Sequence, residues 1–307
     1  MLLSPRLVPG DRVAVVSPAS TPRRDAVDRS VAELRRWGLR PEVGVHAFDE
    51  HAYLAGSDED RLADLNGALR DPGIRAVFAT RGGKGAYRIA DGIDFDALRG
   101  DPKPLVGFSD ITVLMLAVAR HAGVAPVHGP MVSWDEDHIG RAAIGRLRAA
   151  LMTTGPVVVD ADATEPTGEL TTSGRATGPL LGGNQDSVAT AAGWALPPLD
   201  GAIVLLEAFN LRLGHIDRQL TMLRKAGHLA GVSAVAVGQY TQCGREPDEP
   251  ETWSHLTVLR DHLSALDVPI LGGLPIGHGR NPHTIPLDTI ATLDADAGTL
   301  HVDPAVR

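Results

Sequence analysis

The chain has 307 residues, of which 43% are hydrophobic and 22% charged, and its formal charge at neutral pH is −9. This ordinary globular composition excludes a disordered chain and predicts either one large α/β domain or two smaller ones. The acidic balance, with arginines dispersed along the chain, predicts that nucleic acid is not a partner.

The sequence also lacks the signals of a secreted or membrane protein. Residues 1–11 contain too short an apolar run for a signal peptide, and no apolar segment reaches transmembrane length. The one cysteine, Cys243, excludes an intrachain disulfide and fits a reducing compartment. We therefore expect a cytoplasmic protein with no membrane partner, in which Cys243 is a structural thiol.

Strands and helices are predicted to alternate through the first half of the chain. The expected strands are residues 12–17, 43–45, 74–80 and 104–108, and the expected helices are residues 25–37, 58–69 and 111–122. This alternation favours right-handed βαβ units and a mostly parallel sheet, with a site at the carboxyl ends of its strands.

The pattern changes between residues 152 and 178, where Thr, Gly, Asp and Pro separate short pieces such as 155–159 and 168–171. We interpret 152–178 as a linker between an N-terminal domain, residues 1–151, and a C-terminal domain, residues 179–307. In the second domain, the expected strands are 202–206, 234–239 and 290–294, and the expected helices are 216–226 and 253–266.

A candidate nucleophile follows the strand at 104–108. Gly107 stands two residues before Ser109, and a helix is expected directly after it. This order is typical of a nucleophile elbow, in which a sharp turn exposes the hydroxyl and the first helical amides face a developing oxyanion. Ile111 occupies the place of the second glycine of that pattern. The alternative is that Ser109, which precedes Asp110, only caps the helix.

The segment 81–85, Arg-Gly-Gly-Lys-Gly, follows another predicted strand. It would place exposed backbone amides at the same sheet edge, as an oxyanion hole or an anion-binding loop requires, although a plain glycine-rich turn fits equally well. The segment lacks both the Gly-Lys-Ser/Thr ending and the Gly-x-Gly-x-x-Gly spacing of nucleotide sites, which disfavours nucleotide binding.

A candidate acid, Glu207, ends the apolar run 203–206. A carboxylate at the end of a buried strand needs a partner, either a histidine or an arginine such as Arg212 or Arg218.

A candidate base, His278, stands between Gly277 and Gly279, which we interpret as leaving room for a substrate. A Ser-based triad needs such a base and an acid that fixes its tautomer. His128 is the rival base.

Metal binding is not predicted. The chain has 12 histidines but no His-Glu-x-x-His motif and no cysteine pair. His46, His138 and His301 lie in polar contexts, so we expect them to be solvated.

Together, these segments resemble the LD-carboxypeptidase family, whose other branch comprises the microcin C immunity peptidases. The similar segments, in chain order, are residues 9–11, 15–18, 53–58, 81–83 with 85, 107–110, 128–131, 181–184, 207, 216–218 with 220, 277–278 and 286–287. The resemblance runs nearly from end to end.

The resemblance implies a doubly wound N-terminal domain that carries the serine and a β-rich C-terminal α/β domain that carries the acid and the base, usually in a homodimer. It implies Ser109 as nucleophile, His278 as general base and Glu207 as the residue that orients it. The amides of Gly83 and Asp110 would form the oxyanion hole.

Asn184 would face the substrate, and no metal or cofactor would be needed. For the LD-carboxypeptidase branch, the implied reaction is release of D-Ala from muropeptide tetrapeptides during peptidoglycan recycling. The first alternative is a hydrolase that detoxifies or tailors an aminoacyl-nucleotide or a peptide natural product. The second is a muropeptide-binding protein without activity.

The chain departs from the family pattern around the expected site. Lys84 stands where the family commonly has Tyr, and Ala208, Leu211 and Gly214 stand where it has Asp, Glu and Tyr. These departures concern the substrate rather than the chemistry.

Overall fold

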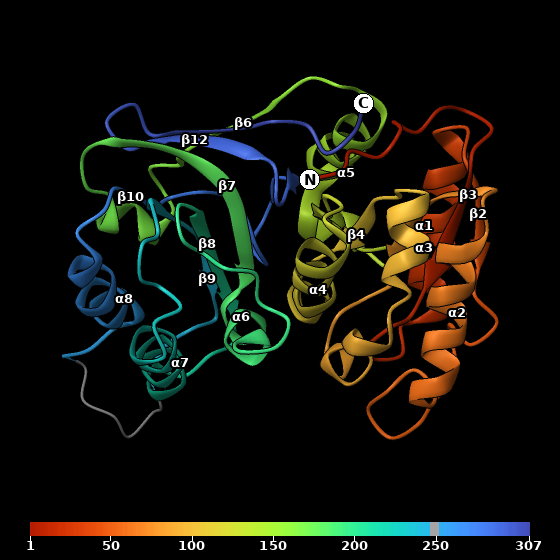
Figure 1. Ribbon diagram of the computed structural model, residues 1–307, viewed down its shortest axis with the longest axis horizontal. Coiled ribbons are helices and arrows are strands. Elements are labelled where there is room, and N and C mark those ends of the chain that lie inside the picture. The colour runs from red at the N-terminus through yellow and green to blue at the C-terminus, as the bar shows by residue number, and fades with distance from the viewer. Residues whose placement is uncertain (246–251) are drawn as a thin grey trace.

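The computed structural model describes residues 1–245 and 252–307 and contains two β-sheets that lie side by side (Figure 1). The strands of the first sheet are β1 (Arg12–Val16), β2 (Arg40–Val43), β3 (Ile74–Ala79), β4 (Leu105–Gly107), β5 (Val127–His128) and β11 (Ile285–Pro286). Their order is β11-β5-β4-β3-β1-β2, and all neighbours are parallel except β11 and β5. The strand order reverses between β1 and β3, as in a doubly wound sheet, where ligands bind beside the switch point.

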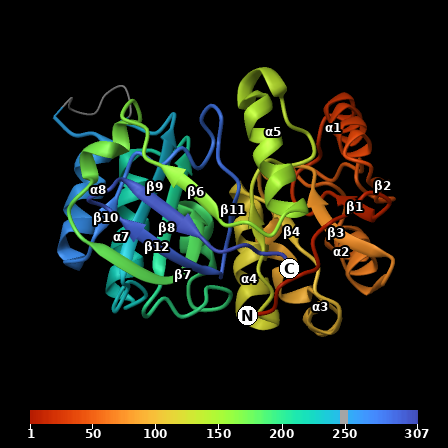
Figure 2. The same cartoon turned by 90° about the horizontal axis from the view of Figure 1, so that it is seen from above.

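Helices cover both faces of this sheet. They are α1 (Arg24–Arg36), α2 (Asp58–Arg70), α3 (Phe95–Gly100), α4 (Thr112–Ala122) and α5 (Glu136–Met152). Val13 and Val15 of β1 share one apolar core with α1 and α5, whereas Ala14 and Val16 share another with α2, α3 and α4. Because side chains alternate across a strand, one short apolar run serves both cores. Figure 2 shows α1 and α5 above the sheet and α3 and α4 below it.

The second sheet is mixed. Its strands are β6 (Val157–Asp160), β7 (Arg175–Asn184), β8 (Ile203–Phe209), β9 (Ala234–Thr241), β10 (Ile270–Leu271), β12 (Ile290–Asp294) and β13 (Thr299–Val302). The order is β10-β9-β8-β7-β12-β13-β6, with parallel pairing from β10 to β7 and antiparallel pairing from β7 to β6. The two sheets and their helices confirm the predicted fold class.

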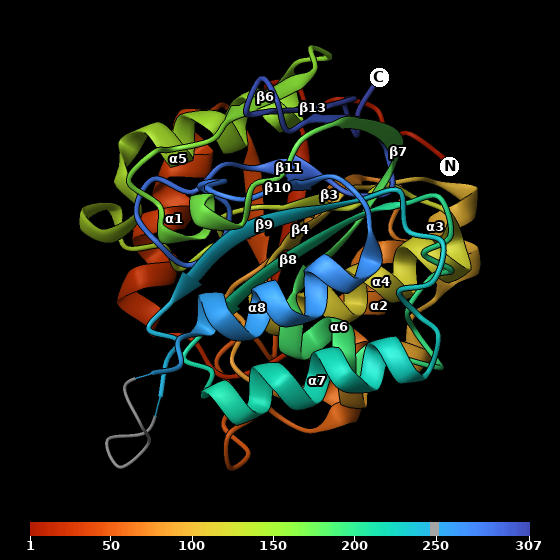
Figure 3. The same cartoon turned by 90° about the vertical axis from the view of Figure 1, so that its left-hand side faces the viewer.

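Helices α6 (Gln185–Ala191), α7 (Leu213–Lys225) and α8 (His255–Leu263) cover one face of the second sheet, and Figure 3 shows α7 and α8 lying side by side. The described residues also form short 3-10 helices: η1 (Ala86–Arg88), η2 (Ala90–Gly92), η3 (Ser109–Ile111), η4 (Pro166–Leu170) and η5 (Ser264–Leu266).

Helix α4 joins the two halves. It contacts β4 of the first sheet on one side and α6 and β7 of the second half on the other, and it lies between the halves in Figure 1. Residues Thr112–Ala119 are accordingly all buried. A helix that is apolar all round is a buried helix. One continuous core therefore runs from the first sheet into the second.

The chain also returns from the second half to the first. Strand β11 pairs with β5, and the C-terminal residues run beside the N-terminal ones, where Arg307 N donates to Ser4 O at 2.9 Å. The two halves are thus linked by more than one crossing of the chain.

Residues 152–178, expected to be a linker, carry structure of their own. Strand β6 pairs with β13 at the edge of the second sheet, residues 168–170 belong to η4, and β7 begins at Arg175. Gly178 lies in this expected linker but serves close packing in β7, since a Cβ there would lie 2.1 Å from the Gly201 carbonyl oxygen. By its pairing, β6 belongs with the second half.

Other expected elements are confirmed to within a few residues, with one exception. The strand expected at 43–45 is wrong in position, because β2 covers Arg40–Val43 and its register is set by pairing of Arg40 with Arg12. This exposed edge strand has no apolar alternation to mark it. Helix α5 was not predicted, and its pattern is interrupted by Gly140, whose φ of 77° breaks the helical geometry. Among the described residues, no helix is long and apolar enough to cross a membrane.

The packing of β7 against β8 makes a prediction about stability. Gly182 has a φ of +124°, and a Cβ there would lie 2.1 Å from the Leu205 carbonyl oxygen. We expect Gly182→Ala to lower the free energy of unfolding by at least about 1–3 kcal/mol. Gly145 is exposed in the middle of α5 with open space around it, so Gly145→Ala should instead raise that free energy by about 0.5–1 kcal/mol. Urea titrations of both variants measure this, and equal effects would contradict the close contact.

Candidate active site

Ser109 follows β4 in a strained turn. Its φ is 61°, in the left-handed region that a non-glycine residue rarely adopts. Gly107 is required two residues earlier, because a Cβ there would lie 2.7 Å from Cγ2 of the fully buried Ile111. Ile111 thus fills the space under the turn where the hydrolase pattern has its second glycine. The local geometry is that of an elbow rather than of an ordinary helix cap, and η3 has no side-chain cap.

The glycine-rich segment after β3 lies directly against Ser109. A Cβ at Gly82 would be 3.1 Å from both Ser109 Oγ and the Asp110 amide nitrogen. Gly83 has a φ of +107° and packs on Ser20, whose Oγ would be 2.4 Å from a Cβ at that position. In the described part of the chain, the amides of Gly83 and Asp110 have no recorded acceptor. Both are therefore available to a ligand.

Glu207 and His278 form an ion pair in which Nδ1 of the histidine lies 2.8 Å from Oε2 of the glutamate. Glu207 is fully buried and sits where the register of β8 against β9 shifts, between Leu206 and Ala208. Such an irregularity re-aims a side chain. Burial alone would raise the pKa of Glu207, but the charge of His278 and the hydrogen bond to it hold that pKa below its ordinary value.

The glycines beside His278 serve this pair rather than leaving room for a substrate, which corrects our interpretation of the sequence. Gly277 has a φ of +135°, and a Cβ there would lie 2.9 Å from Glu207 Oε2. A Cβ at Gly279 would lie 2.3 Å from Gln239 Nε2, and Gly279 N donates to Gln239 Oε1 at 2.8 Å. The neighbouring side chains need the space.

The first half of the chain also holds the loop that carries His278. His138 Nε2 lies 3.0 Å from the His278 carbonyl oxygen, and Asn281 N donates to the Ile139 carbonyl oxygen at 3.1 Å. The irregular turn at Gly140 is where Asn281 fits, since a Cβ there would lie 2.1 Å from Asn281 Oδ1. The start of α5 therefore helps to place a histidine of the other half.

Ser109 and His278 line the same cavity, whose volume is about 990 Å³. The His278 ring lies between two aromatic rings, with its centroid 4.7 Å from that of Phe108 and 4.9 Å from that of Phe209. In the described residues, Ser109 Oγ makes no hydrogen bond. Hydrogen bonds between catalytic groups are often long before a substrate binds.

The walls of the cavity carry charges of both signs. Arg81 and Lys84 lie on the β3 side, and neither forms an ion pair with a carboxylate among the described residues. Asp110 and Asp186 also line the cavity. Burial, helped by the charge of Asp186, raises the pKa of Asp110 to about 6. Asn184 is nearly buried, and its Oδ1 caps α6 by accepting from Ser187 N at 3.3 Å.

Comparison with known proteins places these features in one family. Residues 13–129 match the N-terminal domain of LD-carboxypeptidases, and residues 177–293 match their C-terminal domain. A putative carboxypeptidase of Streptomyces coelicolor is 39% identical over 97% of this chain and 95% of its own length. The chain belongs to the LD-carboxypeptidase family.

A further relative agrees with this assignment, and two solved structures share the fold. The murein tetrapeptide carboxypeptidase of Pseudomonas aeruginosa is 30% identical over 93% of this chain and 94% of its own. The crystal structure of muramoyltetrapeptide carboxypeptidase from Oxalobacter formigenes shares the fold, with a TM-score of 0.83 and 24% identity over 95% of this chain and 98% of that one. The microcin C7 self immunity protein MccF, in complex with aspartyl sulfamoyl adenosine, has a TM-score of 0.88 and 21% identity over both full chains.

The structure brings together most of the predicted site residues. Ser109, Asp110, Gly83, Asn184 and His278 all line the cavity, and Glu207 lies buried behind His278.

Other lining residues were not predicted. Phe209, Trp134, Asp186 and His138 reach the cavity from elements far apart in the chain. The position of Asp186 two residues after Asn184 was the one local signal that could have identified it.

The residues that depart from the family pattern do not all face the cavity. Lys84 and Leu211 line it, whereas Ala208 is fully buried. His128, the rival base, is 1% exposed and does not line the cavity.

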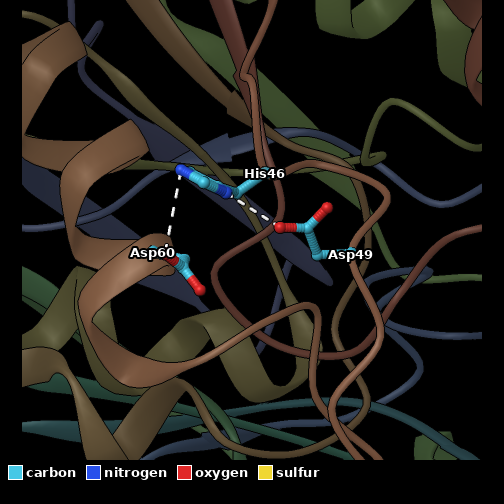
Figure 4. A group of neighbouring side chains, drawn as sticks. All are labelled: His46, Asp49 and Asp60. Carbon is cyan, nitrogen blue, oxygen red and sulfur yellow. Dashed lines mark hydrogen bonds and ion pairs between the residues drawn. The ribbon is translucent and has the colours of Figure 1, made fainter.

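One group outside the cavity has the residue types of a metal site. His46, Asp49 and Asp60 lie within 4.8 Å of one another (Figure 4). However, Asp49 contacts Nδ1 of His46 at 2.8 Å, whereas Asp60 approaches Nε2 at 3.8 Å on the opposite side of the ring. Asp60 Oδ2 also accepts a hydrogen bond from Ser57 Oγ in the cap of α2. The arrangement is that of an ion-paired loop, and the hydrogen bond to Asp49 raises the pKa of His46.

Cys243 is a half-buried thiol whose sulfur accepts a hydrogen bond from Leu211 N at 3.4 Å. Burial raises its pKa to about 11, which leaves little reactive thiolate. This environment supports the expectation of a structural thiol.

The buried His128 makes the stability of the fold depend on pH. Burial lowers the pKa of His128 to about 4, from an ordinary value of 6.5. Between these pH values the unfolded chain binds more protons than the folded chain. The free energy of unfolding is therefore fully retained above about pH 6.5 and falls by roughly 3 kcal/mol as the pH is lowered toward about 4. Urea unfolding across this window gives the slope of the unfolding free energy against pH. This slope should correspond to about one proton fewer in His128→Phe than in the exposed control His301→Gln. Equal slopes would contradict a neutral buried His128.

Proposed function

We propose that the chain is a serine-type carboxypeptidase that releases the terminal D-Ala of muropeptide tetrapeptides, with Ser109 as nucleophile, His278 as base and Glu207 as its orienting acid. One observation carries this proposal: the buried ion pair of Glu207 and His278 opens into the cavity that Ser109 lines. The names of the similar proteins from Pseudomonas aeruginosa and Oxalobacter formigenes support the substrate.

The arrangement supports acyl transfer in two steps. With its Nδ1 hydrogen donated to Glu207, His278 presents Nε2 as a base, takes the proton of Ser109 as the hydroxyl attacks the peptide carbonyl, and gives it to the departing amine. The amides of Gly83 and Asp110 would stabilise the oxyanion. Water then cleaves the acyl-enzyme, with His278 again as the base.

The C-terminal carboxylate of the substrate is proposed to be held by Arg81 and Lys84, in the glycine-rich segment 81–85. A carboxypeptidase must recognise a terminal carboxylate, and Arg81 and Lys84 flank Gly82 and Gly83 without a carboxylate partner among the described residues. Asn184 is proposed to contact the peptide from the opposite wall. Lys84 would then give this chain a second cation where the family has Tyr.

Three further features remain proposals: a cytoplasmic location, a homodimer, and the division into domains 1–151 and 179–307. The two family matches fall on either side of residues 152–178, which supports the division. The pairing of β6 with β13 supports assigning residues 157–160 to the second domain as well.

The nucleophile is tested by substitution. We expect Ser109→Ala to lower the kcat for D-Ala release from a muropeptide tetrapeptide by at least about 10⁴-fold, because the variant lacks the hydroxyl that is proposed to form the acyl-enzyme. Ser264→Ala, at an exposed serine in η5, is the matched control and should leave kcat unchanged. Released D-Ala is measured by coupled oxidation. Turnover by Ser109→Ala at the wild-type rate would refute the serine mechanism.

The same assay separates the alternatives. A muropeptide-binding protein without activity would bind the tetrapeptide tightly, by calorimetry, and release no D-Ala. A hydrolase of the kind suggested by the fold shared with MccF would cleave an aminoacyl sulfamoyl adenosine in preference to the tetrapeptide. Either result would replace the proposed substrate.

The role of Lys84 is tested by removing one charge from the enzyme or from the substrate. Lys84→Ala should raise the KM for the tetrapeptide about tenfold, the equivalent of one charge-assisted hydrogen bond, with little change in kcat. For the same peptide with an amidated C-terminus, the variant and the wild type should have equal KM values. Lys225→Ala, at the exposed end of α7, is the control. An equal rise in KM for both peptides would show that Lys84 does not bind the carboxylate.

A further inference from the structure

Beside the ion pair of Glu207 and His278 lie polar atoms that have no partner. Oε1 of Glu207 and both ring nitrogens of His128 are buried and lack a hydrogen bond within the described residues. Glu207 is fully buried, and His128 is 1% exposed. Buried polar atoms without a protein partner are costly and are commonly satisfied by an ordered water.

The fold holds His128 at the junction of the two sheets. It ends β5, where it pairs with Gly107 of β4 on one side and with Ile285 of β11 on the other. Its ring extends toward the second sheet, because a Cβ at Gly183 of β7 would lie 3.5 Å from His128 Cδ2, the atom bonded to Nε2. The next residue, Asn184, pairs directly with Glu207. The imidazole therefore faces the strand pair that carries Glu207.

The charges of the three groups act on one another. Attraction to Glu207 favours the protonated form of His128 and thus raises its pKa against the larger effect of burial, while the charge of His278 lowers it. In return, His128 helps to lower the pKa of Glu207. Phe108 contacts both histidine rings, with centroid separations of 5.6 Å to His128 and 4.7 Å to His278. Three titratable groups thus share one solvent-poor site.

We propose that His128 is a positioning residue for Glu207, its ring N–H donating through one ordered water to Oε1 while Oε2 holds His278. A neutral imidazole has one N–H donor, and Oε1 has the free acceptor capacity to receive the bond from the water. The inference rests on the proposed function only in taking His278 as the base.

Such a link fixes the plane of the carboxylate. With both oxygens hydrogen-bonded, Glu207 cannot rotate away from His278. The imidazole of His278 then keeps its Nδ1 hydrogen and its orientation. Without the link, Glu207 is held by His278 and by the side chain of Asn184, which also helps to lower the pKa of Glu207. His128 would then act on the reaction without contacting the substrate.

The first test uses the free protein. His128→Phe keeps the ring and its burial but removes the N–H, whereas His128→Gln keeps an N–H donor. Proton NMR should show a low-field signal from the His278 Nδ1 hydrogen, assigned by its loss in His278→Asn. We expect the Phe variant to shift or broaden this signal and the Gln variant to retain it. An unchanged signal in the Phe variant refutes the link.

The second test is kinetic and structural. On the muropeptide tetrapeptide, His128→Phe should lower kcat about tenfold at unchanged KM, the rate equivalent of about one hydrogen bond, and His128→Gln should recover most of the loss. Equal losses in the two variants would assign His128 to packing. If the Phe variant does not fold, a high-resolution crystal structure of the wild type decides, because a dry contact between His128 and Glu207 overturns the proposal.

These readouts separate this inference from the proposed function. If the wild type releases no D-Ala, the proposed substrate fails, whereas the NMR signal and the crystal structure still decide whether His128 is linked to Glu207.

Discussion

The contact between the buried carboxylate of Glu207 and the ring of His278 constrains much of the second half of the molecule. A fully buried carboxylate without a partner would cost several kcal/mol, so the fold must deliver a donor to it. The register shift in β8 aims the acid, and the left-handed Gly277 lets the histidine loop approach it closely. Gln239 then holds the histidine loop by accepting a hydrogen bond from Gly279 N. The site geometry follows from satisfying one buried charge.

Ser109 and the ion pair of Glu207 and His278 lie in different halves of the molecule. The strained turn at Ser109 lies between a parallel strand and a helix in the first half, whereas Glu207 and His278 belong to the second half, where the carboxylate is buried. Helix α4 belongs to both, since it begins just after Ser109 and packs on β7 and α6. Because a single core runs through this helix, Ser109 and His278 are held by one packed body rather than by a hinge.

The sequence predicted those features that depend on local pattern. The apolar runs before Ser109 and Glu207 and the glycine at 107 each carry a short-range signal, and these elements lie where expected. The pairing of Glu207 with His278 joins residues 71 positions apart, and no local pattern encodes such a contact. Gly178 contributed to the interpretation of residues 152–178 as a linker, because glycine is common in loops and also marks close approach of two backbones, and only the neighbouring strand distinguishes the two.

The resemblance to a family predicted the site residues but not why two glycines stand beside His278. They suggested space for a substrate, but that space is filled by Glu207 and Gln239. Phe108, Phe209 and residues 81–84 line the cavity, where the peptide is proposed to bind. Lys84 and Leu211 differ from the family pattern and line this cavity, so we propose that they act on the substrate, whereas Gly277 and Gly279 make room for Glu207 and Gln239. Substrate preference can change at the first pair without disturbing the buried charge on which the fold depends.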